Sequence, residues 1–129
     1  MDTISNMLIS IKNGQAVQKE SVTFPYSKLK MEILKILTDE KFVKDVQKRG
    51  KKGKKLIEVF LEYKENGQPK IKGIERVSKL SRRVYLPAKK ITSVAQGRGL
   101  MIISTPKGIL TDKLARKENV GGEVICKIW

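Results

Sequence analysis

The 129-residue sequence contains no histidine, one cysteine and few aromatic residues, which make up 5% of the chain. Histidine is the commonest general base near neutral pH, so its absence also removes the Ser-His and Cys-His nucleophile pairs. One cysteine and scattered carboxylates do not form a credible zinc ligand set. The composition argues against an enzyme and a metal site, and we expect no catalytic residues and no cofactor.

Other common signals are also missing. No apolar run approaches the roughly 18 residues that a membrane helix needs, and Met1 leads directly into Asp2 and Thr3 without a secretory leader. The lone Cys126 excludes an internal disulfide and suits a reducing compartment. Segment 97–99 resembles the start of a dinucleotide fingerprint, but it lacks the third glycine and leads into a predicted strand. We therefore expect a cytoplasmic protein with no membrane segment and no small-molecule substrate.

Positive charge is the most informative feature that is present. The chain has 28 Lys and Arg residues against 13 Asp and Glu, a net charge of +15. Residues 1–68 carry 14 basic and 9 acidic residues (+5), whereas residues 69–129 carry 14 and 4 (+10). Such an excess indicates a polyanionic partner, because basic groups near phosphates release condensed counterions. The C-terminal half should face this partner more directly. A basic protein without a nucleic-acid partner is the alternative.

The N-terminal half begins with the pattern of an amphipathic helix. Its apolar residues recur at a spacing of three and four: Ile4, Met7, Leu8 and Ile11. Asp2 and Thr3 can cap this helix, Lys12 lies in its last turn, and Gly14 can end it. The opposite face is polar and short: Thr3, Ser5, Asn6, Ser10 and Asn13. Such a face can approach a phosphate backbone closely, or it can simply be solvated.

A second helix is predicted after Pro25, with Ser27 as its N-cap. We expect its buried side to consist of Leu29, Ile33, Ile36 and Leu37, and its outer side to be kept basic by Lys28, Lys30 and Lys35. Three strands are predicted at 22–24, 42–46 and 56–63. The segment 48–55 carries six charges and two glycines and is expected to be a hairpin tip, either solvated or in nonspecific contact with phosphates.

The turn signal at 65–69 places a boundary between two subdomains, 1–68 and 69–129. In the second, strands are predicted at 71–77, 82–86 and 100–103, with a short helical turn at 91–94. A polar turn at 104–108 is followed by a second short strand and then by a helix that starts near Thr111 and Asp112. We expect Leu114 and Ala115 to face inward, Gly121 to cap the helix, and Val124, Cys126 and Ile128 to alternate into the core. The predicted fold class is α+β, with two helices on a three-stranded antiparallel sheet and then a mainly-β part with one short helix.

Ordered motifs cover almost the whole chain. The N-terminal ones are Asp2-x-Ile4-x-x-Met7-Leu8-x-x-Ile11-Lys12-Asn13-Gly14 and Pro25-x-Ser27-Lys28-Leu29-Lys30. The central ones are Arg76-Val77-Ser78-Lys79 and Arg83-Val84-Tyr85. The strongest are Gly97-x-Gly99, Ile103-Ser104-Thr105-x-Lys107-Gly108, Leu110-Thr111-Asp112-Lys113, Ala115-Arg116 and Gly121-Gly122-Glu123-Val124-Ile125-Cys126. Together they resemble the ribosomal protein S8 family of the bacterial or organellar small subunit.

The resemblance implies a two-domain α+β protein that binds the central domain of 16S rRNA early in subunit assembly, beside ribosomal proteins S5 and S12. It implies that the C-terminal domain makes most of the specific contacts and that the N-terminal helix region adds backbone contacts. The implied rRNA-binding residues are Ser104, Thr105, Pro106, Lys107, Gly108, Gly121, Gly122, Glu123, Arg83, Tyr85, Thr3, Lys12, Asn13 and Lys28. A regulatory module that binds an mRNA resembling the rRNA site is the alternative.

Physical chemistry makes these roles reasonable. The hydroxyls of Ser104 and Thr105 donate and accept hydrogen bonds at short range, and glycines let a backbone come close to its ligand. The lysines and arginines, Arg82 among them, would anchor phosphates and so set register and affinity. Tyr85 could stack on a base or sugar, or it could be a half-buried strand tyrosine.

The chain departs from the family's pattern at several places. Pro106 stands where a third hydroxyl is usual, and its φ near −65° does not suit a primed hairpin turn, so we expect a longer turn or one of another type. Leu80-Ser81-Arg82 replaces Pro-Gly-Leu, which predicts a less stiff linker with one extra positive charge. Arg98, Met101 and Lys127 also replace commoner apolar or aromatic residues.

Overall fold

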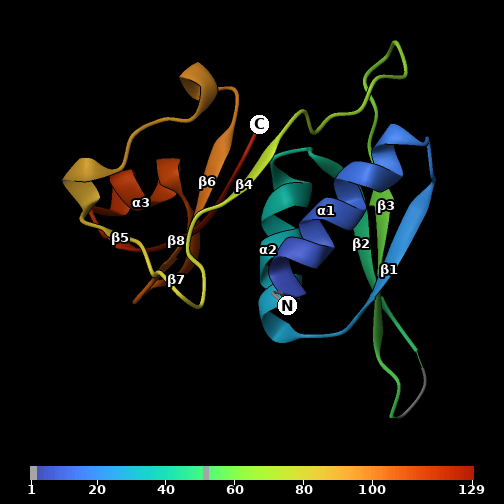
Figure 1. Ribbon diagram of the computed structural model, residues 1–129, viewed down its shortest axis with the longest axis horizontal. Coiled ribbons are helices and arrows are strands. Elements are labelled where there is room, and N and C mark those ends of the chain that lie inside the picture. Colours follow the sequence, from blue (N-terminus) through green and yellow to red (C-terminus); the bar gives the residue numbers. More distant parts are fainter. Residues whose placement is uncertain (1–2, 51–52) are drawn as a thin grey trace. The chain divides into compact units, whose positions relative to one another are not determined.

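The structure is a computed structural model that describes residues 3–50 and 53–129 (Figure 1). The chain divides into two compact units, Met1–Lys72 and Gly73–Trp129, so the division falls four residues after the predicted boundary at 68. Within the described ranges, three α-helices and two antiparallel sheets make the fold α+β, as predicted. Asp2 of the predicted first cap and Lys51 and Lys52 of the predicted basic tip lie outside the described residues.

The N-terminal unit consists of two helices and a three-stranded sheet. Its elements are α1 (Thr3–Ala16), β1 (Ser21–Pro25), α2 (Lys28–Asp39), β2 (Val43–Arg49) and β3 (Leu56–Leu61). The strand order is β1-β3-β2, antiparallel throughout, with α1 against β1 and β3 and α2 against β2 (Figure 1). Ile57, Val59 and Leu61 alternate along β3 and are buried, which is the period-2 pattern of a strand covered on one face.

Helix α1 carries the predicted apolar stripe but does not end where predicted. The four residues of the stripe are all buried: Ile4, Met7, Leu8 and Ile11. Gly14 lies inside the helix and is buried, and a Cβ there would be 3.0 Å from Leu61 Cδ1 and 3.1 Å from Val22 Cγ1. A small residue at this position lets the helix approach the sheet closely. The prediction that Gly14 ends the helix was wrong, because the glycine is required by packing against the sheet and not by capping.

Helix α2 is capped as predicted, since the Ser27 hydroxyl accepts from the Lys30 backbone N–H at 3.1 Å. Its buried stripe, however, follows a different phase: Lys30, Ile33, Leu34 and Leu37. Leu29, predicted to be buried, is 42% exposed, and Ile36 is only partly buried. Lys30, predicted to face outward, is buried while its Nζ donates to the Pro25 carbonyl oxygen at 3.3 Å. The long apolar stem of lysine can be buried when its ammonium finds an acceptor.

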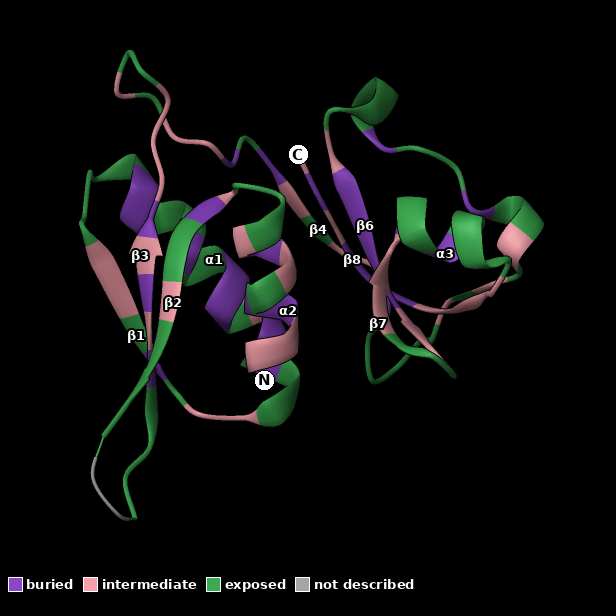
Figure 2. Ribbon diagram, turned by 180° about the vertical axis from the view of Figure 1, so that it is seen from behind, coloured by how far each residue is buried: buried purple, intermediate pink, exposed green. Residues whose placement is uncertain are grey.

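The C-terminal unit is mainly β. Its elements are β4 (Ile74–Arg76), β5 (Tyr85–Leu86), β6 (Leu100–Thr105), β7 (Gly108–Thr111), α3 (Asp112–Glu118) and β8 (Gly122–Ile128), with 3₁₀ turns at Ala88–Lys90 and Ala95–Gly97. The order is β4-β8-β6-β7, and β5 also pairs with β8. A compact aliphatic core includes Ile91, Val94, Met101, Ile103, Ala115 and Val124. Figure 2 shows this burial along β6.

Several C-terminal expectations need correction. The strands predicted at 71–77 and 82–86 shorten to β4 and β5, and Ile91 and Val94 are extended and buried between two 3₁₀ turns instead of forming a helical turn. Leu114 is 40% exposed, whereas Ala115 is buried as predicted. The C-cap of α3 is Asn119, in the left-handed conformation with φ 55°, and not Gly121. Burial of the three alternating residues of β8 is confirmed: Val124, Cys126 and Ile128.

Asp112 does more than favour the start of α3. It is 4% exposed, and one carboxylate oxygen accepts from the Met101 backbone N–H at 3.1 Å, while the other pairs with Arg116 at 3.2 Å. Thr111 supplies the N-cap, because its hydroxyl accepts from Leu114 N–H. The carboxylate therefore ties α3 to β6, the strand that leads into the polar turn.

Candidate nucleic-acid interface

The hairpin that joins β6 to β7 presents the predicted polar turn. Thr105 pairs with Gly108, so Pro106 and Lys107 form a two-residue tip. Neither tip residue has the positive φ of a primed turn, and the left-handed φ of 110° falls on Gly108. The prediction that Pro106 excludes a primed turn is confirmed, although the loop is not lengthened.

The Thr105 hydroxyl is used inside this turn. It donates to the Gly108 carbonyl oxygen at 2.8 Å and accepts from the Lys107 backbone N–H at 3.1 Å. A hydroxyl has one hydrogen and two lone pairs, so Thr105 keeps one acceptor position and no free donor. Its effect on a ligand therefore acts largely through the shape of the turn.

Three predicted residues form a cross-strand row: Ser104, Glu123 and Tyr85. Ser104 on β6 pairs with Glu123 on β8, which pairs with Tyr85 on β5. Opposed residues of antiparallel strands project from one face, with Cβ atoms about 4.5–5.5 Å apart. Tyr85 is 67% exposed, so the half-buried alternative is wrong. Within the described part of the chain, the Ser104 hydroxyl has no hydrogen-bond partner. The row thus offers a free hydroxyl, a carboxylate and an exposed ring.

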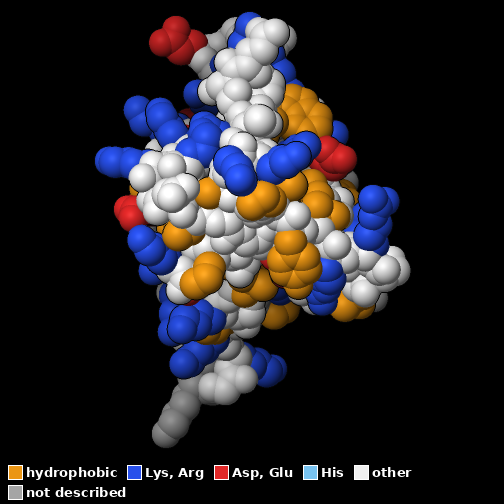
Figure 3. Space-filling model, turned by 90° about the vertical axis from the view of Figure 1, so that its left-hand side faces the viewer, with side chains coloured by type: hydrophobic (Ala, Val, Ile, Leu, Met, Phe, Trp, Pro, Cys, Tyr) orange, Lys and Arg blue, Asp and Glu red, His pale blue; other side chains and the backbone are white. Residues whose placement is uncertain are grey.

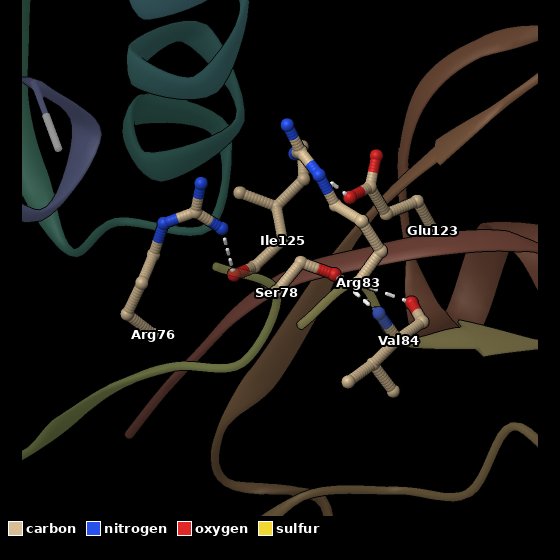
Figure 4. A network of polar contacts seen from close by, with 6 residues as sticks. All are labelled: Arg76, Ser78, Arg83, Val84, Glu123 and Ile125. Atoms are coloured by element: carbon tan, nitrogen blue, oxygen red, sulfur yellow. Dashed lines mark hydrogen bonds and ion pairs between the residues drawn. The ribbon is translucent and has the colours of Figure 1, made fainter. Parts of the chain in front are cut away.

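The carboxylate in this row is held by Arg83, whose guanidinium lies 3.1 Å from Glu123 (Figure 4). The Arg83 side chain is 47% exposed and that of Glu123 is 22% exposed. An ion pair this exposed contributes little to stability, but it limits the directions in which the carboxylate can point. Because an ionised carboxylate only accepts hydrogen bonds, Glu123 favours a ligand group that donates.

Gly121 and Gly122 are explained by the packing of β8 against its neighbours. A Cβ on Gly122 would lie 2.0 Å from the Ser104 carbonyl oxygen, and one on Gly121 would lie 2.4 Å from the Leu86 carbonyl oxygen. Both are overlaps with backbone. The two glycines therefore let β8 pass close to β6 and β5, which brings Glu123 into the row.

The segment before β5 is anchored to β8 by a network that sequence reasoning missed (Figure 4). Ser78 is fully buried, and its hydroxyl accepts from Val84 N–H at 2.9 Å and donates to the Val84 carbonyl oxygen at 3.3 Å. Ser78 N–H donates to the Val124 carbonyl oxygen, and the Arg76 guanidinium donates to that of Ile125. The only sequence signal was the position of Ser78 in the motif Arg76-Val77-Ser78-Lys79.

The C-terminal unit as a whole carries an excess of positive charge. Residues 73–129 carry 12 basic and 4 acidic residues, a net charge of +8, and Lys and Arg side chains outnumber acids on the face seen in Figure 3. Lys107 at the tip is exposed and pairs with Glu118 at 3.2 Å, with both side chains largely in water. Such a pair is weak and is readily exchanged for a phosphate.

The remaining predicted residues belong to the N-terminal unit. Thr3, Lys12 and Asn13 are exposed on α1, and Lys28 is exposed at the start of α2. Asn13 also lines a shallow groove of about 720 Å³ between α1 and β1, whose polar residues include Ser10, Asn13, Lys19, Ser21 and Thr23. The predicted polar face of α1 is therefore solvent-accessible.

Two further features of the N-terminal unit escaped prediction. The positive charge of Lys72 is the main cause that lowers the pKa of Lys64, and Lys70 adds to it, so three ammonium groups gather on the segment that closes this unit. Gln15 is fully buried, and its amide donates to the carbonyl oxygens of Phe42 and Glu62 and accepts from Ile71 N–H. Nothing in the sequence pattern distinguished Gln15 from the polar face of α1.

Neither a metal centre nor a membrane helix is found in the part of the chain that the structure describes. Residues 3–50 and 53–129 contain no group of three or more His, Cys, Asp or Glu residues that could hold a metal ion. No helix within the same ranges is both long and apolar enough to cross a bilayer.

Comparison with known proteins gives a consistent result. A family model described as Ribosomal protein S8 matches residues 2–129. The chain is 48% identical to the small ribosomal subunit protein uS8 of Kosmotoga olearia, over 99% of this chain and 98% of that protein. It is 46% identical to uS8 of Clostridioides difficile, over 99% and 97%, and 44% identical to uS8 of Thermus aquaticus, over 99% and 98%. The similarity therefore extends through both units.

Proposed function

Since the chain belongs to the ribosomal protein S8 family, we propose that it is a structural protein of the small ribosomal subunit that binds the central domain of 16S rRNA. In this role it organises the rRNA during assembly, acts in the cytoplasm as part of the ribosome, catalyses no reaction, and neighbours ribosomal proteins S5 and S12. The C-terminal unit makes the specific contacts, and Thr3, Lys12, Asn13 and Lys28 add backbone contacts from the N-terminal unit.

The cross-strand row is the observation that carries this proposal. Proteins recognise RNA mainly at irregular helices and shallow grooves, through 2′-hydroxyls, exposed base edges and stacked bases. The free Ser104 hydroxyl can donate and accept, Glu123 can accept from a 2′-hydroxyl or a base amino group, and the exposed Tyr85 ring can stack. A carboxylate repels phosphates, so a row with Glu123 at its centre favours a sugar or base edge.

The basic residues of the C-terminal unit supply the second part of binding. Arg83, which pairs with Glu123 of the row, and Lys107, at the tip of the β6–β7 hairpin, can anchor phosphates. Such contacts set register and affinity but carry no sequence information. Gly108 leaves the turn without a side chain at its left-handed position. Within the described ranges, no heavy atom beyond its chain neighbours lies within 4 Å of the place that a Cβ would take there. The backbone of the turn is thus open to close approach by RNA.

A chemical footprint of the full-length protein on naked 16S rRNA tests the proposal. We expect protection confined to one irregular helix of the central domain, and we expect Glu123→Gln to weaken that protection without changing its position. Absence of any localised protection would refute the proposal. A protein that binds such an RNA but never sediments with small subunits in high salt would instead be a regulator of an mRNA.

A further inference from the structure

A tight turn at residues 79–82, here called the basic turn, projects from the segment between β4 and β5. Lys79 and Arg82 exchange two backbone hydrogen bonds, at 2.8 and 3.0 Å, so Leu80 and Ser81 form a two-residue tip. Neither tip residue has a positive φ, so this turn forms without a glycine. The backbone of the turn can therefore accommodate the side chains of Leu80 and Ser81 without strain.

The base of the basic turn is firmly held. Ser78 and Val84, which flank it, are joined by the buried Ser78 hydroxyl (Figure 4). Both residues are also hydrogen-bonded to Val124 of β8 through their backbones. A turn anchored on both sides to the central strand loses little further conformational entropy when it binds a ligand. It therefore presents its side chains at a fixed place in the C-terminal unit.

The exposed chemistry of the basic turn combines one apolar group with two cations. Leu80 is 84% exposed, more than any other large hydrophobic side chain in the described part of the chain. Lys79 and Arg82 are exposed, and as an opposed pair they project from the same side of the turn. Within the described ranges neither has an ion-pair partner. The Leu80, Lys79 and Arg82 side chains therefore do not stabilise the protein, and all three are available to contact a ligand.

We propose that the basic turn is a second RNA-binding element, separate from the cross-strand row. Lys79 and Arg82 bind backbone phosphates, and Leu80 packs against the riboses between them. This inference rests on the proposed rRNA binding and adds a contact surface to it. RNA is favoured over a protein partner because one leucine is far below the roughly 800 Å² that each partner buries in a stable protein interface. Two unpaired cations on one side of it match a phosphate backbone instead.

The test compares salt-dependent binding of full-length variants to 16S rRNA. Lys79→Gln/Arg82→Gln should reduce the slope of log K against log salt by about 1.4–1.8, the value for two lost phosphate contacts. Leu80→Ser should weaken binding about three- to tenfold at every salt concentration and leave the slope unchanged. The matched controls are Leu114→Ser, which is also exposed, and Lys113→Gln/Lys117→Gln on α3. Both should change binding less than the variants of the basic turn.

A position-specific probe gives an independent readout. Ser81→Cys can carry a hydroxyl-radical source, because the native Cys126 is buried. We expect RNA cleavage from this site within the region that the whole protein protects. The inference would be overturned, with the proposed function left intact, if both turn variants bound the rRNA normally. The same holds if a protein labelled at position 81 bound the rRNA but did not cleave it. Loss of subunit incorporation by Leu80→Ser with normal RNA binding would overturn it in favour of a protein contact. A wild-type protein that does not bind the rRNA would refute the proposed function itself.

Discussion

The Thr105 hydroxyl donates a hydrogen bond to the Gly108 carbonyl oxygen across the β6–β7 turn, at 2.8 Å. The neighbouring Ser104 hydroxyl makes no hydrogen bond to any residue in the described ranges. Two adjacent hydroxyls that belong to the same sequence motif therefore differ in role. Thr105 fixes the turn, and Ser104 remains available to a ligand in the cross-strand row.

This difference predicts different effects of two alanine substitutions. Ser104→Ala should weaken binding to cognate rRNA by about 1–3 kcal/mol, because a buried RNA group is left unsatisfied, with no change in thermal stability. Thr105→Ala should weaken binding to a similar degree and also lower the free energy of unfolding by about 1 kcal/mol, since the turn loses two hydrogen bonds.

Titrations with cognate and scrambled RNA, together with thermal unfolding, separate the two effects. Thr105→Ser keeps the hydroxyl and is the matched control, which should restore both stability and binding. An equal loss on cognate and scrambled RNA for Ser104→Ala would contradict its role as a specific contact.

Gly122 and Gly14 should respond differently to the same added methyl group. In Gly122→Ala the Cβ would overlap the Ser104 backbone oxygen at 2.0 Å, so we expect a loss of about 3 kcal/mol or more. In Gly14→Ala the nearest atoms are the ends of the Leu61 and Val22 side chains, which can move. The helix propensity of alanine, worth about 1 kcal/mol over glycine, offsets this crowding. Urea unfolding of both variants checks the contrast, and equal losses would show that the backbone overlap is not decisive.

The fold was largely predictable where one periodicity dominates. The stripe of α1 and the alternation of β8 were predicted correctly because each fits a single period. The phase of α2 was wrong because Leu29 and Lys30 are adjacent, and hydrophobicity alone favours burying Leu29. Burial of Lys30 depends on an acceptor, the Pro25 carbonyl oxygen, which only the three-dimensional structure supplies.

The members of the candidate site were predicted, but their arrangement was not. A register shift between Ile102 and Ile103 in the pairing with β8 sets Glu123 opposite Ser104. Without it, a different residue of β8 would face Ser104, because a slip of one residue exchanges the two faces of a strand. Such a shift has no sequence signal of its own. The partner of the Thr105 hydroxyl likewise depends on the turn geometry and could not be read from the motif.

Gln15 should be one of the most sensitive polar residues of the N-terminal unit. Gln15→Ala would leave the Ile71 N–H and the Phe42 and Glu62 carbonyl oxygens without their side-chain partner, so we expect a loss of about 2–4 kcal/mol. Gln18→Ala is the matched control, because the Gln18 side chain is exposed and its amide donates to the Gly67 carbonyl oxygen. It should cost well under about 1 kcal/mol. Urea unfolding followed by circular dichroism checks both, and a similar midpoint for the two variants would contradict the anchoring role of Gln15.

The ion pair between Lys107 and Glu118 should compete with RNA for the same ammonium group. Its 3.2 Å contact is largely exposed, so Glu118→Gln should change thermal stability by less than about 0.5 kcal/mol. The variant should nevertheless bind 16S rRNA about two- to fivefold more tightly at low salt, because Lys107 no longer has to leave a carboxylate. Lys107→Ala should reduce the salt slope by about 0.7–0.9, the value for one phosphate contact.

Combining the two changes separates competition from a general effect of charge. Glu75→Gln is the matched control, because it removes the same charge from an exposed position on β4. In a protein that already carries Lys107→Ala, Glu118→Gln should tighten RNA binding no more than Glu75→Gln does. A gain that persists without Lys107 would mean that Glu118 only repels the RNA at a distance. A gain that disappears would mean that Glu118 holds the Lys107 ammonium in the free protein and that RNA binding must first release it, since only a shared partner makes the two substitutions non-additive.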